Sequence, residues 1–340
     1  MKKKMNVEDS VGSVLAYDLT KIVPGEFKGA AFRKGHIIRP EDVEAMKKMG
    51  KYHIYAIELG EDEMHENEAS QFIAERVTGD GISFTEPNEG KVSLVSKHRG
   101  VLKINVEALE EVNDIDMVIF STMHNNSLVE EGTTVAGTRI IPLTIKSEYL
   151  EKLRDLEEKY GKIIEVVPLE KLNCGIVVTG TEVFEGLITD KFGPVLEQKI
   201  RELGGNYLET RFSRDDVESI KTELDYFLKN GADLVLVSGG MSVDADDVTP
   251  IAIRETVDEV VSYGSPVLPG AMFMMGYRGD ATVLGIPACG MFHRITVLDL
   301  VLPRVFIGEK MSRRDISKLG HGGLCLGCKV CTYPVCPFGK

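Results

Sequence analysis

The chain of 340 residues contains no tryptophan, and aromatic residues make up only 7% of it. No apolar run reaches the roughly 20 residues that a membrane-spanning helix needs, so we do not expect a membrane protein. Basic residues number 40 against 53 acidic ones, and the net charge of −13 argues against nucleic-acid binding through a general basic surface. Only six cysteines are present, and four of them crowd into the last sixteen residues, which makes a disulfide framework unexpected.

The N-terminus also lacks an export signal. The basic segment MKKKM is followed by the acids Glu8 and Asp9 and not by an apolar core. This pattern predicts no signal peptide and a cytoplasmic protein.

What is present is the composition of a globular protein, with 43% hydrophobic and 27% charged residues. A chain of this length is too long for one ordinary core, so several domains are expected. Pattern changes along the chain predict four segments. They are a small β-rich module (1–60), an α+β middle region of unknown role (61–172), an α/β domain (173–308) and a cysteine-rich tail (309–340).

Two segments of the middle region are predicted to be connections. Gly60–Asn67 is rich in acids and is expected to be a linker. Ser147–Tyr160 is a charged helix that stops at Gly161, and we expect it to join the middle region to the α/β domain.

The region from Cys174 onward alternates predicted strands and helices. Such alternation implies right-handed crossovers and a three-layer α/β/α domain around a mostly parallel sheet. The expected strands are 174–179, 206–212, 234–238 and 281–286. The expected helices are 191–203, 214–229, 248–257 and 291–306.

The segment Ser238–Asp247, SGGMSVDADD, follows an apolar strand and precedes a helix. A glycine turn between a strand and a helix N-terminus is where α/β sheets bind anions. Acids in such a turn fit a divalent cation that bridges them to a phosphate or another oxyanion. They also fit a structural role as helix caps. The acids in question are Asp244, Asp246 and Asp247.

Three further loops are expected at the same sheet edge, at Thr179–Glu182, Leu268–Ala271 and Ile286–Gly290. No GxGxxG or P-loop fingerprint is present, so a nucleotide-binding motif is missing. Glycine N–H groups, hydroxyls and carboxylates in one pocket predict a site for a phosphorylated, polyoxygenated ligand with a cation.

These loops resemble a known family. The motifs TGTE (179–182), ITD (188–190), SGGMSVDADD (238–247), LPGA (268–271) and GIPACG (285–290) have the order and spacing of the molybdopterin-binding domain shared by molybdenum insertases and gephyrin-type proteins. The similarity covers residues 173–308. A segment near the N-terminus, FRKGHIIRPEDVEAMKKMG, also resembles the part that precedes this domain in the insertases.

The resemblance implies molybdopterin or molybdenum cofactor as the bound pterin, Mg²⁺ as a further cofactor, and a homo-oligomer. It places catalytic roles on Glu182, Asp190 and Asp247. The cofactor-binding residues that we predict are Thr179, Gly180, Thr181, Ser238, Gly239, Gly240, Ser242, Asp246, Pro269, Gly270, Pro287 and Cys289.

The chain departs from the family pattern in its rim loops. LPGAM and GIPACG stand where the family has KPGKP and GLPGNP, so two lysines and an asparagine are missing. Asp244 replaces a usual glycine and Thr181 a usual acid. Because lysines steady phosphate groups and molybdate, their loss weakens the case for turnover more than the case for pterin binding.

Three functions follow as hypotheses. The first is an insertase-like transferase that places molybdate into a bound, possibly adenylated, molybdopterin. The second is a non-catalytic carrier or maturation factor that passes finished cofactor to a client molybdoenzyme. The third is a nucleotide pyrophosphate hydrolase.

The tail reads Cys325-x2-Cys328-x2-Cys331-x4-Cys336-Pro337. Thiolates at this spacing predict a [4Fe–4S] cluster, since the run is close to the ferredoxin pattern, or a tetrahedral Zn²⁺ site. The alternative is a tail of unliganded thiols. The glycines at 322 and 323 predict that the tail is mobile.

Overall fold

The computed structural model describes residues 3–23, 27–242, 244 and 247–340. It contains two compact units, Met1–Asn125 with Val129–Val167, and Asn126–Leu128 with Pro168–Lys340. The finer division into four segments stays a prediction. Within the described ranges, no helix is both long and apolar enough to cross a membrane.

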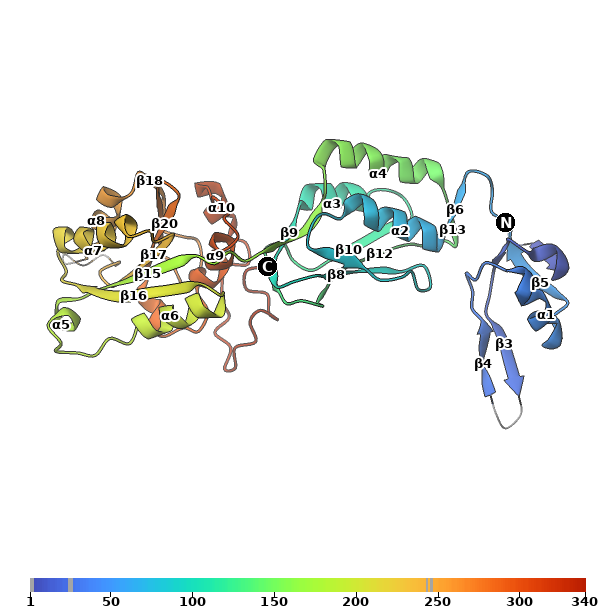
Figure 1. Ribbon diagram of the computed structural model, residues 1–340, viewed down its shortest axis with the longest axis horizontal. Coiled ribbons are helices and arrows are strands. Elements are labelled where there is room, and N and C mark those ends of the chain that lie inside the picture. Colours follow the sequence, from blue (N-terminus) through green and yellow to red (C-terminus); the bar gives the residue numbers. More distant parts are fainter. Residues whose placement is uncertain (1–2, 24–26, 243, 245–246) are drawn as a thin grey trace. The chain divides into compact units, whose positions relative to one another are not determined.

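The first part of unit 1 is a small β-rich module with one helix (Figure 1). Strand β5 pairs antiparallel with both β1 and β2, and α1 packs Met46 into the small core beneath them. Helix α1 starts at Pro40 because proline suits the first turn of a helix and the Asp42 carboxylate accepts a hydrogen bond from the Arg39 N–H (2.8 Å). The elements are β1 Lys3–Asn6, η1 Glu8–Ser10, β2 Val14–Leu15, β3 Leu19–Val23, β4 Phe27–Phe32, α1 Pro40–Lys48 and β5 His53–Ile57.

The rest of unit 1 is an α+β region with a four-stranded antiparallel sheet in the order β10-β12-β8-β7. Its elements are β6 Glu63–His65, α2 Glu66–Val77, β7 Ile82–Phe84, β8 Val92–Ser96, β9 Gly100–Ile104, α3 Val106–Asn113, β10 Val118–Thr122, β11 Leu128–Val129, β12 Thr134–Ile140, β13 Thr144–Lys146, α4 Ser147–Tyr160 and β14 Ile164–Pro168.

Two expectations for this region are wrong. The predicted acidic linker contains strand β6, which pairs antiparallel with β13, so it is part of the packed unit. Helix α4 has the predicted bounds, but it buries Leu150, Leu153 and Leu156 in the core of unit 1. The charge of its outer face hid this apolar stripe, which recurs every three residues.

Unit 2 contains the predicted three-layer α/β domain. Its six-stranded sheet has the order β16-β15-β17-β20-β19-β18; the first four strands are parallel, and β19 runs antiparallel to both of its neighbours. The elements are β15 Asn173–Thr179, α5 Thr181–Phe184, α6 Gly193–Glu202, β16 Asn206–Ser213, α7 Val217–Lys229, β17 Leu234–Ser238, α8 Thr249–Thr256, β18 Glu259–Tyr263, β19 Met274–Arg278, β20 Ala281–Ile286, η2 Ala288–Met291, α9 Val297–Val305 and α10 Arg313–Lys318.

Both faces of this sheet are covered, and alternate residues of each strand enter different cores. In β17, Leu234 and Leu236 pack toward α6 and α9, while Val235 and Val237 pack toward α7 and α8. Figure 1 shows α6 and the pair α7–α8 on opposite faces. The uninterrupted apolar run of β17 is explained by this double burial.

Three boundaries in unit 2 differ from the sequence expectation. The helix predicted from residue 214 begins at Val217, because β16 extends to Ser213 and Asp216 is the cap that accepts from the Ser219 N–H (2.8 Å). The helix predicted at 291–306 is only α9, which starts after a capping box at Thr296. Strands β18 and β19 and helix α10 were not predicted at all.

A substitution at Phe227 tests how much the core between the sheet and α7 contributes to stability. Its ring lies so close to β15 that a Cβ on Gly175 would come within 2.4 Å of it, and its side chain is 1% exposed. We expect Phe227→Ala to lower the free energy of unfolding of unit 2 by about 3–5 kcal/mol, since a large cavity results. The neighbouring Tyr226→Ala, at a position 39% exposed, should cost clearly less. Urea unfolding of both variants checks this, and equal losses would contradict it.

Candidate functional site

The sheet of unit 2 has a topological switch point between β15 and β17. The chain leaves β15 for β16 on one side and then returns to place β17 on the other side of β15. At such a point the crossovers diverge to opposite faces and leave a crevice at the carboxyl ends of the strands, where ligands bind in open α/β sheets. In the register, Val178 of β15 lies beside Ser238 of β17, so both strands end at the same edge.

The glycine turn after β17 is packed against the end of β15. Gly239 has φ +94°, and a Cβ there would come within 2.3 Å of the Thr179 carbonyl oxygen. Gly240 has φ +52°, and its Cβ would come within 2.8 Å of Thr249 Oγ1. Only glycine meets both requirements, the left-handed backbone and the close approach. The structure thus brings together two of the predicted loops and the start of α8.

The hydroxyls of Thr179 and Thr249 lie behind this turn, with their Oγ1 atoms 3.3 Å apart. Both residues are buried. The Thr249 N–H donates to the Gly240 carbonyl (3.2 Å), which fixes the turn on the first residue of α8. Thr249 was not among the predicted site residues.

Ser238 is 1% exposed, and its hydroxyl has no hydrogen-bond partner within the described part of the chain. Buried hydroxyls nearly always have a partner, because an unpaired one loses the hydrogen bonds it makes in water. Ser238 is the last residue of β17, directly before the glycine turn. An unsatisfied polar atom therefore lies at the switch point.

The turn after β15 is held by an acid that the sequence analysis missed. Gly180 has φ +149° and caps the short helix α5. The N–H and the hydroxyl of Thr181 both donate to Asp215 Oδ2, at 2.8 and 3.2 Å. Asp215 follows β16, whose carboxyl end lies at the same edge. The rule that identified the other loops, polar residues after a parallel strand, would also have found it.

The three acids with predicted catalytic roles differ in what they contact. Asp190 caps α6, since its carboxylate accepts from the N–H groups of Phe192 (2.7 Å) and Gly193 (3.0 Å). Asp247 closes its own loop by accepting from the Asp244 N–H (2.9 Å). Glu182 is exposed on α5, and its carboxylate makes no contact with the residues that the structure describes.

The two remaining rim loops belong to the same edge, because β18 and β20 run parallel to β17. Pro269 follows a cis peptide bond, and its carbonyl accepts from the Val297 N–H (3.2 Å). Gly270, at φ +135°, lies against Val297, where a Cβ would come within 2.5 Å of the side chain.

In the loop after β20, Pro287 is buried and Cys289 is half-buried. Burial raises the pKa of the Cys289 thiol. Of the other predicted residues, Ser242 is exposed and Asp246 lies outside the described residues.

The predicted metal ligands do not gather. Among residues 3–23, 27–242, 244 and 247–340, no group of three or more His, Cys, Asp or Glu side chains could hold a metal ion. The carboxylates of Glu182, Asp190 and Asp247 therefore do not form a ready Mg²⁺ site. The four tail cysteines are free; Cys328 is exposed, and Cys325, Cys331 and Cys336 are partly exposed.

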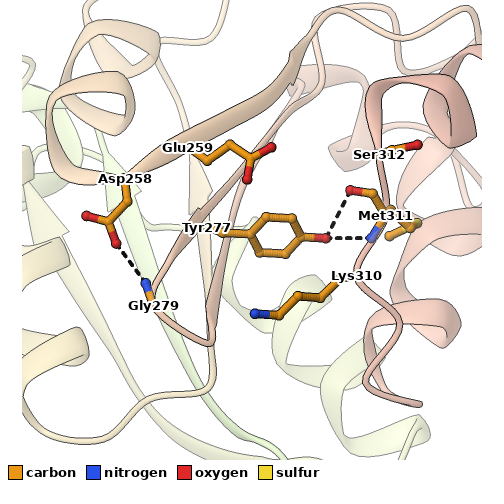
Figure 2. Close-up of a pocket in the computed structure, with 7 residues that line it drawn as sticks. All are labelled: Asp258, Glu259, Tyr277, Gly279, Lys310, Met311 and Ser312. Carbon is orange, nitrogen blue, oxygen red and sulfur yellow. Dashed lines mark hydrogen bonds between the residues drawn. The ribbon is translucent and has the colours of Figure 1, made fainter.

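A pocket of about 340 Å³ lies at the opposite edge of the sheet, where β18 begins (Figure 2). The Tyr277 hydroxyl accepts from the Met311 N–H (2.7 Å), and the Asp258 carboxylate accepts from the Gly279 N–H (2.8 Å). Burial raises the pKa of Tyr277. The bond of Tyr277 holds the chain before α10 in place, and the bond of Asp258 holds the β19–β20 turn. The pocket adds no residue to the switch-point site.

A family model covers the part of the chain that contains this edge. Residues 175–306 match the family model described as a probable molybdopterin binding domain. Residues 4–58 match a family model described as a domain of unknown function, DUF8806.

Curated relatives match over a short stretch. The chain is 37% identical over 76 residues to a CinA-like protein of Mycobacterium tuberculosis and 39% identical over 76 residues to that of Mycobacterium leprae. The match spans 22% of this chain and only 18% of either relative.

Solved structures align with longer parts of the chain. The tungsten cofactor synthesizing protein MoaB from Pyrococcus furiosus is 21% identical, with a TM-score of 0.35 over 40% of this chain and 93% of that one. The molybdopterin biosynthesis Mog protein from Mycobacterium ulcerans is also 21% identical, with a TM-score of 0.35 over 39% and 94% of the two chains.

The thiols provide a test of this description. Burial raises the pKa of Cys289, and burial raises that of Cys174 to about 12, so at a given pH a smaller fraction of each thiol is ionised than at an ordinary cysteine. Because the thiolate is the reacting form, iodoacetamide at about pH 8 should label Cys328 first, Cys289 more slowly and Cys174 only after unfolding. Labelling of Cys289 should accelerate as the pH rises. Peptide mass spectrometry measures the three rates, and a Cys289 as fast as Cys328 would contradict the described burial.

Proposed function

We propose that the chain binds a phosphorylated pterin of the molybdopterin type and acts in molybdenum cofactor biosynthesis, from the premise that residues 175–306 are a domain of the molybdopterin-binding family. The observation that supports the site most directly is the buried hydroxyl of Ser238 at the switch point, which has no hydrogen-bond partner among the described residues. In this proposal a ligand oxygen is its partner.

In this proposal the phosphate end of the pterin lies over the glycine turn. Gly239 and Gly240 have no side chain to block a close approach, and Ser238 donates its hydroxyl. The start of α8 at Thr249 contributes the positive end of the helix dipole, which favours an anion. The Thr179 hydroxyl, which now faces Thr249, is a second donor within reach of the turn.

For the reaction itself we propose insertase-like transfer of molybdate to an adenylated molybdopterin, with release of AMP. The site acts by positioning and by charge complementarity rather than by a covalent intermediate. Glu182 is the candidate proton acceptor for the water that attacks the adenylate, because Asp190 and Asp247 are engaged in holding their loops. No step is assigned to Mg²⁺, since the described acids do not form a group that could hold it.

The second candidate is a non-catalytic carrier that delivers finished cofactor to a client molybdoenzyme. It is favoured by the rim loops LPGA and GIPACG, which carry no lysine to steady an incoming molybdate. The cysteine-rich tail, with an iron–sulfur or zinc centre, would be its redox or docking element.

One assay separates these functions. Purified full-length protein is incubated anaerobically with adenylated molybdopterin, with and without molybdate, and AMP is measured. Molybdate-dependent AMP release supports the insertase, whereas tight pterin binding without AMP supports the carrier. Hydrolysis of dinucleotides without molybdate would point to a pyrophosphate hydrolase. Absence of pterin binding would overturn the proposal.

Ser238→Ala tests the ligand site. Removing a hydroxyl that has no partner among the residues the structure describes should leave the free energy of unfolding nearly unchanged. It should weaken the binding of an oxidised, fluorescent phosphorylated pterin roughly tenfold, the value of one hydrogen bond to a charged group. Thr282→Val is the matched control, because Thr282 is also buried but lies at the other edge of the sheet. Equal affinities of Ser238→Ala and the wild type would contradict the site.

Glu182→Gln tests the chemical step. Loss of the proton acceptor should lower molybdate-dependent AMP release by roughly 10²–10⁴-fold while the dissociation constant for the pterin stays the same. Glu185→Gln is the control, since Glu185 lies one turn away and pairs with Arg214 (3.7 Å). A loss of pterin affinity equal to the loss of rate would show that Glu182 binds ligand instead.

A further inference from the structure

The candidate site is bordered by two segments that expose large apolar side chains. One is the segment 184–192, which joins α5 to α6, and the other is η2 with the residue that follows it. Single exposed apolar residues are common, but several on adjoining segments mark a surface that a ligand or a partner covers. The exposed side chains are Phe184 (44%), Leu187 (71%), Ile188 (57%), Met291 (41%) and Phe292 (81%).

These two segments are packed against each other. Phe192, at the end of the first segment, is buried, and a Cβ on Gly290 of η2 would come within 3.0 Å of its ring. The first segment is also bonded to the candidate proton acceptor, because the N–H groups of Leu187 and Ile188 donate to the Glu182 carbonyl (2.8 and 3.3 Å). The apolar surface therefore adjoins the candidate site.

Ser238 lies on the same face of the sheet as this surface. Side chains alternate along β17, and Leu234 and Leu236 enter the core that also contains Phe192. Ser238 continues that series, and its neighbour in the register on β20 is Ile286, which belongs to the same core. The chain leaves β20 at Ile286 and enters η2 two residues later. On this face, η2 therefore borders the end of β17 that carries the buried hydroxyl.

The segment that carries Phe292 is fixed at both ends. At its start, the N–H groups of Phe292 and His293 donate to the Cys289 carbonyl (3.1 and 3.0 Å). At its end, the Val297 N–H is bonded to the rim loop 268–271 (3.2 Å). A backbone held in this way presents the aromatic ring to a ligand with little further loss of conformational entropy.

The rim loop that holds Val297 is held in turn by the end of the chain. The Leu268 N–H donates to the Gly323 carbonyl, and the Cys325 N–H donates to the Leu268 carbonyl, both at 2.8 Å. Phe338 is buried in the core that covers this face of the sheet. The expectation of a mobile tail is wrong, because it ignored the apolar residues that follow the cysteines. The tail thus supports the rim of the candidate site.

We propose that Phe292 is the stacking platform for a flat heteroaromatic ring of the phosphorylated ligand whose phosphate end lies at the glycine turn. The inference rests on the proposed function and specifies which residue contacts the ring. Flat heteroaromatic rings stack on aromatic side chains, and the contact accepts different rings because it needs no fixed pattern of hydrogen bonds. Two such rings occur in the proposed reaction, the pterin and the adenine of the adenylate.

The composition of the rim favours contact with a ring. The loops LPGA and GIPACG contain no charged residue, so they offer a ligand no ion pair. Among the aromatic residues whose side chains the structure describes, Phe292 is the most exposed. A ligand ring stacked on it removes this apolar surface from water, which is favourable.

The first experiment measures the contact through affinity. Phe292→Ala should weaken the binding of the oxidised, fluorescent phosphorylated pterin roughly 5- to 150-fold, which corresponds to the loss of one stacking aromatic residue, whereas Phe292→Tyr should keep the affinity. Urea unfolding should not distinguish either variant from the wild type, because the side chain is exposed. Tyr226→Ala is the matched control, since Tyr226 is an exposed aromatic residue in the last turn of α7.

The second experiment detects the stacking itself. The chain contains no tryptophan, so Phe292→Trp introduces the only indole, and a ring stacked on this indole quenches its emission. AMP should quench it if the adenine is the stacked ring, and ribose 5-phosphate, which carries a phosphate without a heteroaromatic ring, should not. Tyr226→Trp is the control and should respond to neither ligand.

The two experiments identify the ring or overturn the platform. A loss of pterin affinity in Phe292→Ala without quenching by AMP shows that the pterin stacks, and quenching by AMP with unchanged pterin affinity shows that the adenine stacks. If pterin binds equally well to Phe292→Ala and the wild type and AMP does not quench, the platform fails and the pterin site stands. If the wild type does not bind pterin but AMP quenches, the proposed function fails and the platform stands. Absence of both signals would overturn both.

Discussion

The close approach of the Gly239 backbone to the Thr179 carbonyl is the constraint on which the candidate site depends. Any side chain at residue 239 would push the turn away from β15, because its Cβ would lie 2.3 Å from the Thr179 oxygen. The turn would then leave Thr249 and the start of α8. Directly before this turn lies the buried Ser238 hydroxyl, which has no partner in the part of the chain that the structure describes.

The constraint in turn requires a rigid sheet beneath it. Strands β15 and β17 are buried on both faces, and each alternates its side chains between two separate cores. Gly175 contributes to this rigidity, because its lack of a side chain lets the Phe227 ring of α7 lie directly on β15. The edge where the loops meet is thus positioned by residues that have no contact with a ligand.

Sequence patterns predicted the elements whose signals are local. The apolar run 234–238, for example, predicted strand β17 with its observed bounds. Strands β18 and β19 were missed although their pairing is also local, since Tyr263 pairs with Met274 and Arg278 with Ala281. Asp215 follows a parallel strand, so the rule that identified the other loops would have found it. Thr249 was missed because its role depends on the approach of its hydroxyl to Thr179 of β15, which chain order does not reveal.

The acids around the site need not repel an anionic ligand. Asp190 and Asp247 accept hydrogen bonds from backbone N–H groups of their own loops, and Asp215 accepts from Thr181, so much of their charge is already compensated. A phosphate at the glycine turn would then face the dipole of α8 and the hydroxyls of Ser238 and Thr179. Among the described acids of these loops, Glu182 and Asp244 keep a carboxylate without a hydrogen-bond or ion-pair partner. An acid-rich edge can therefore bind an anion without a bridging cation, provided that each acid first satisfies the loop on which it lies.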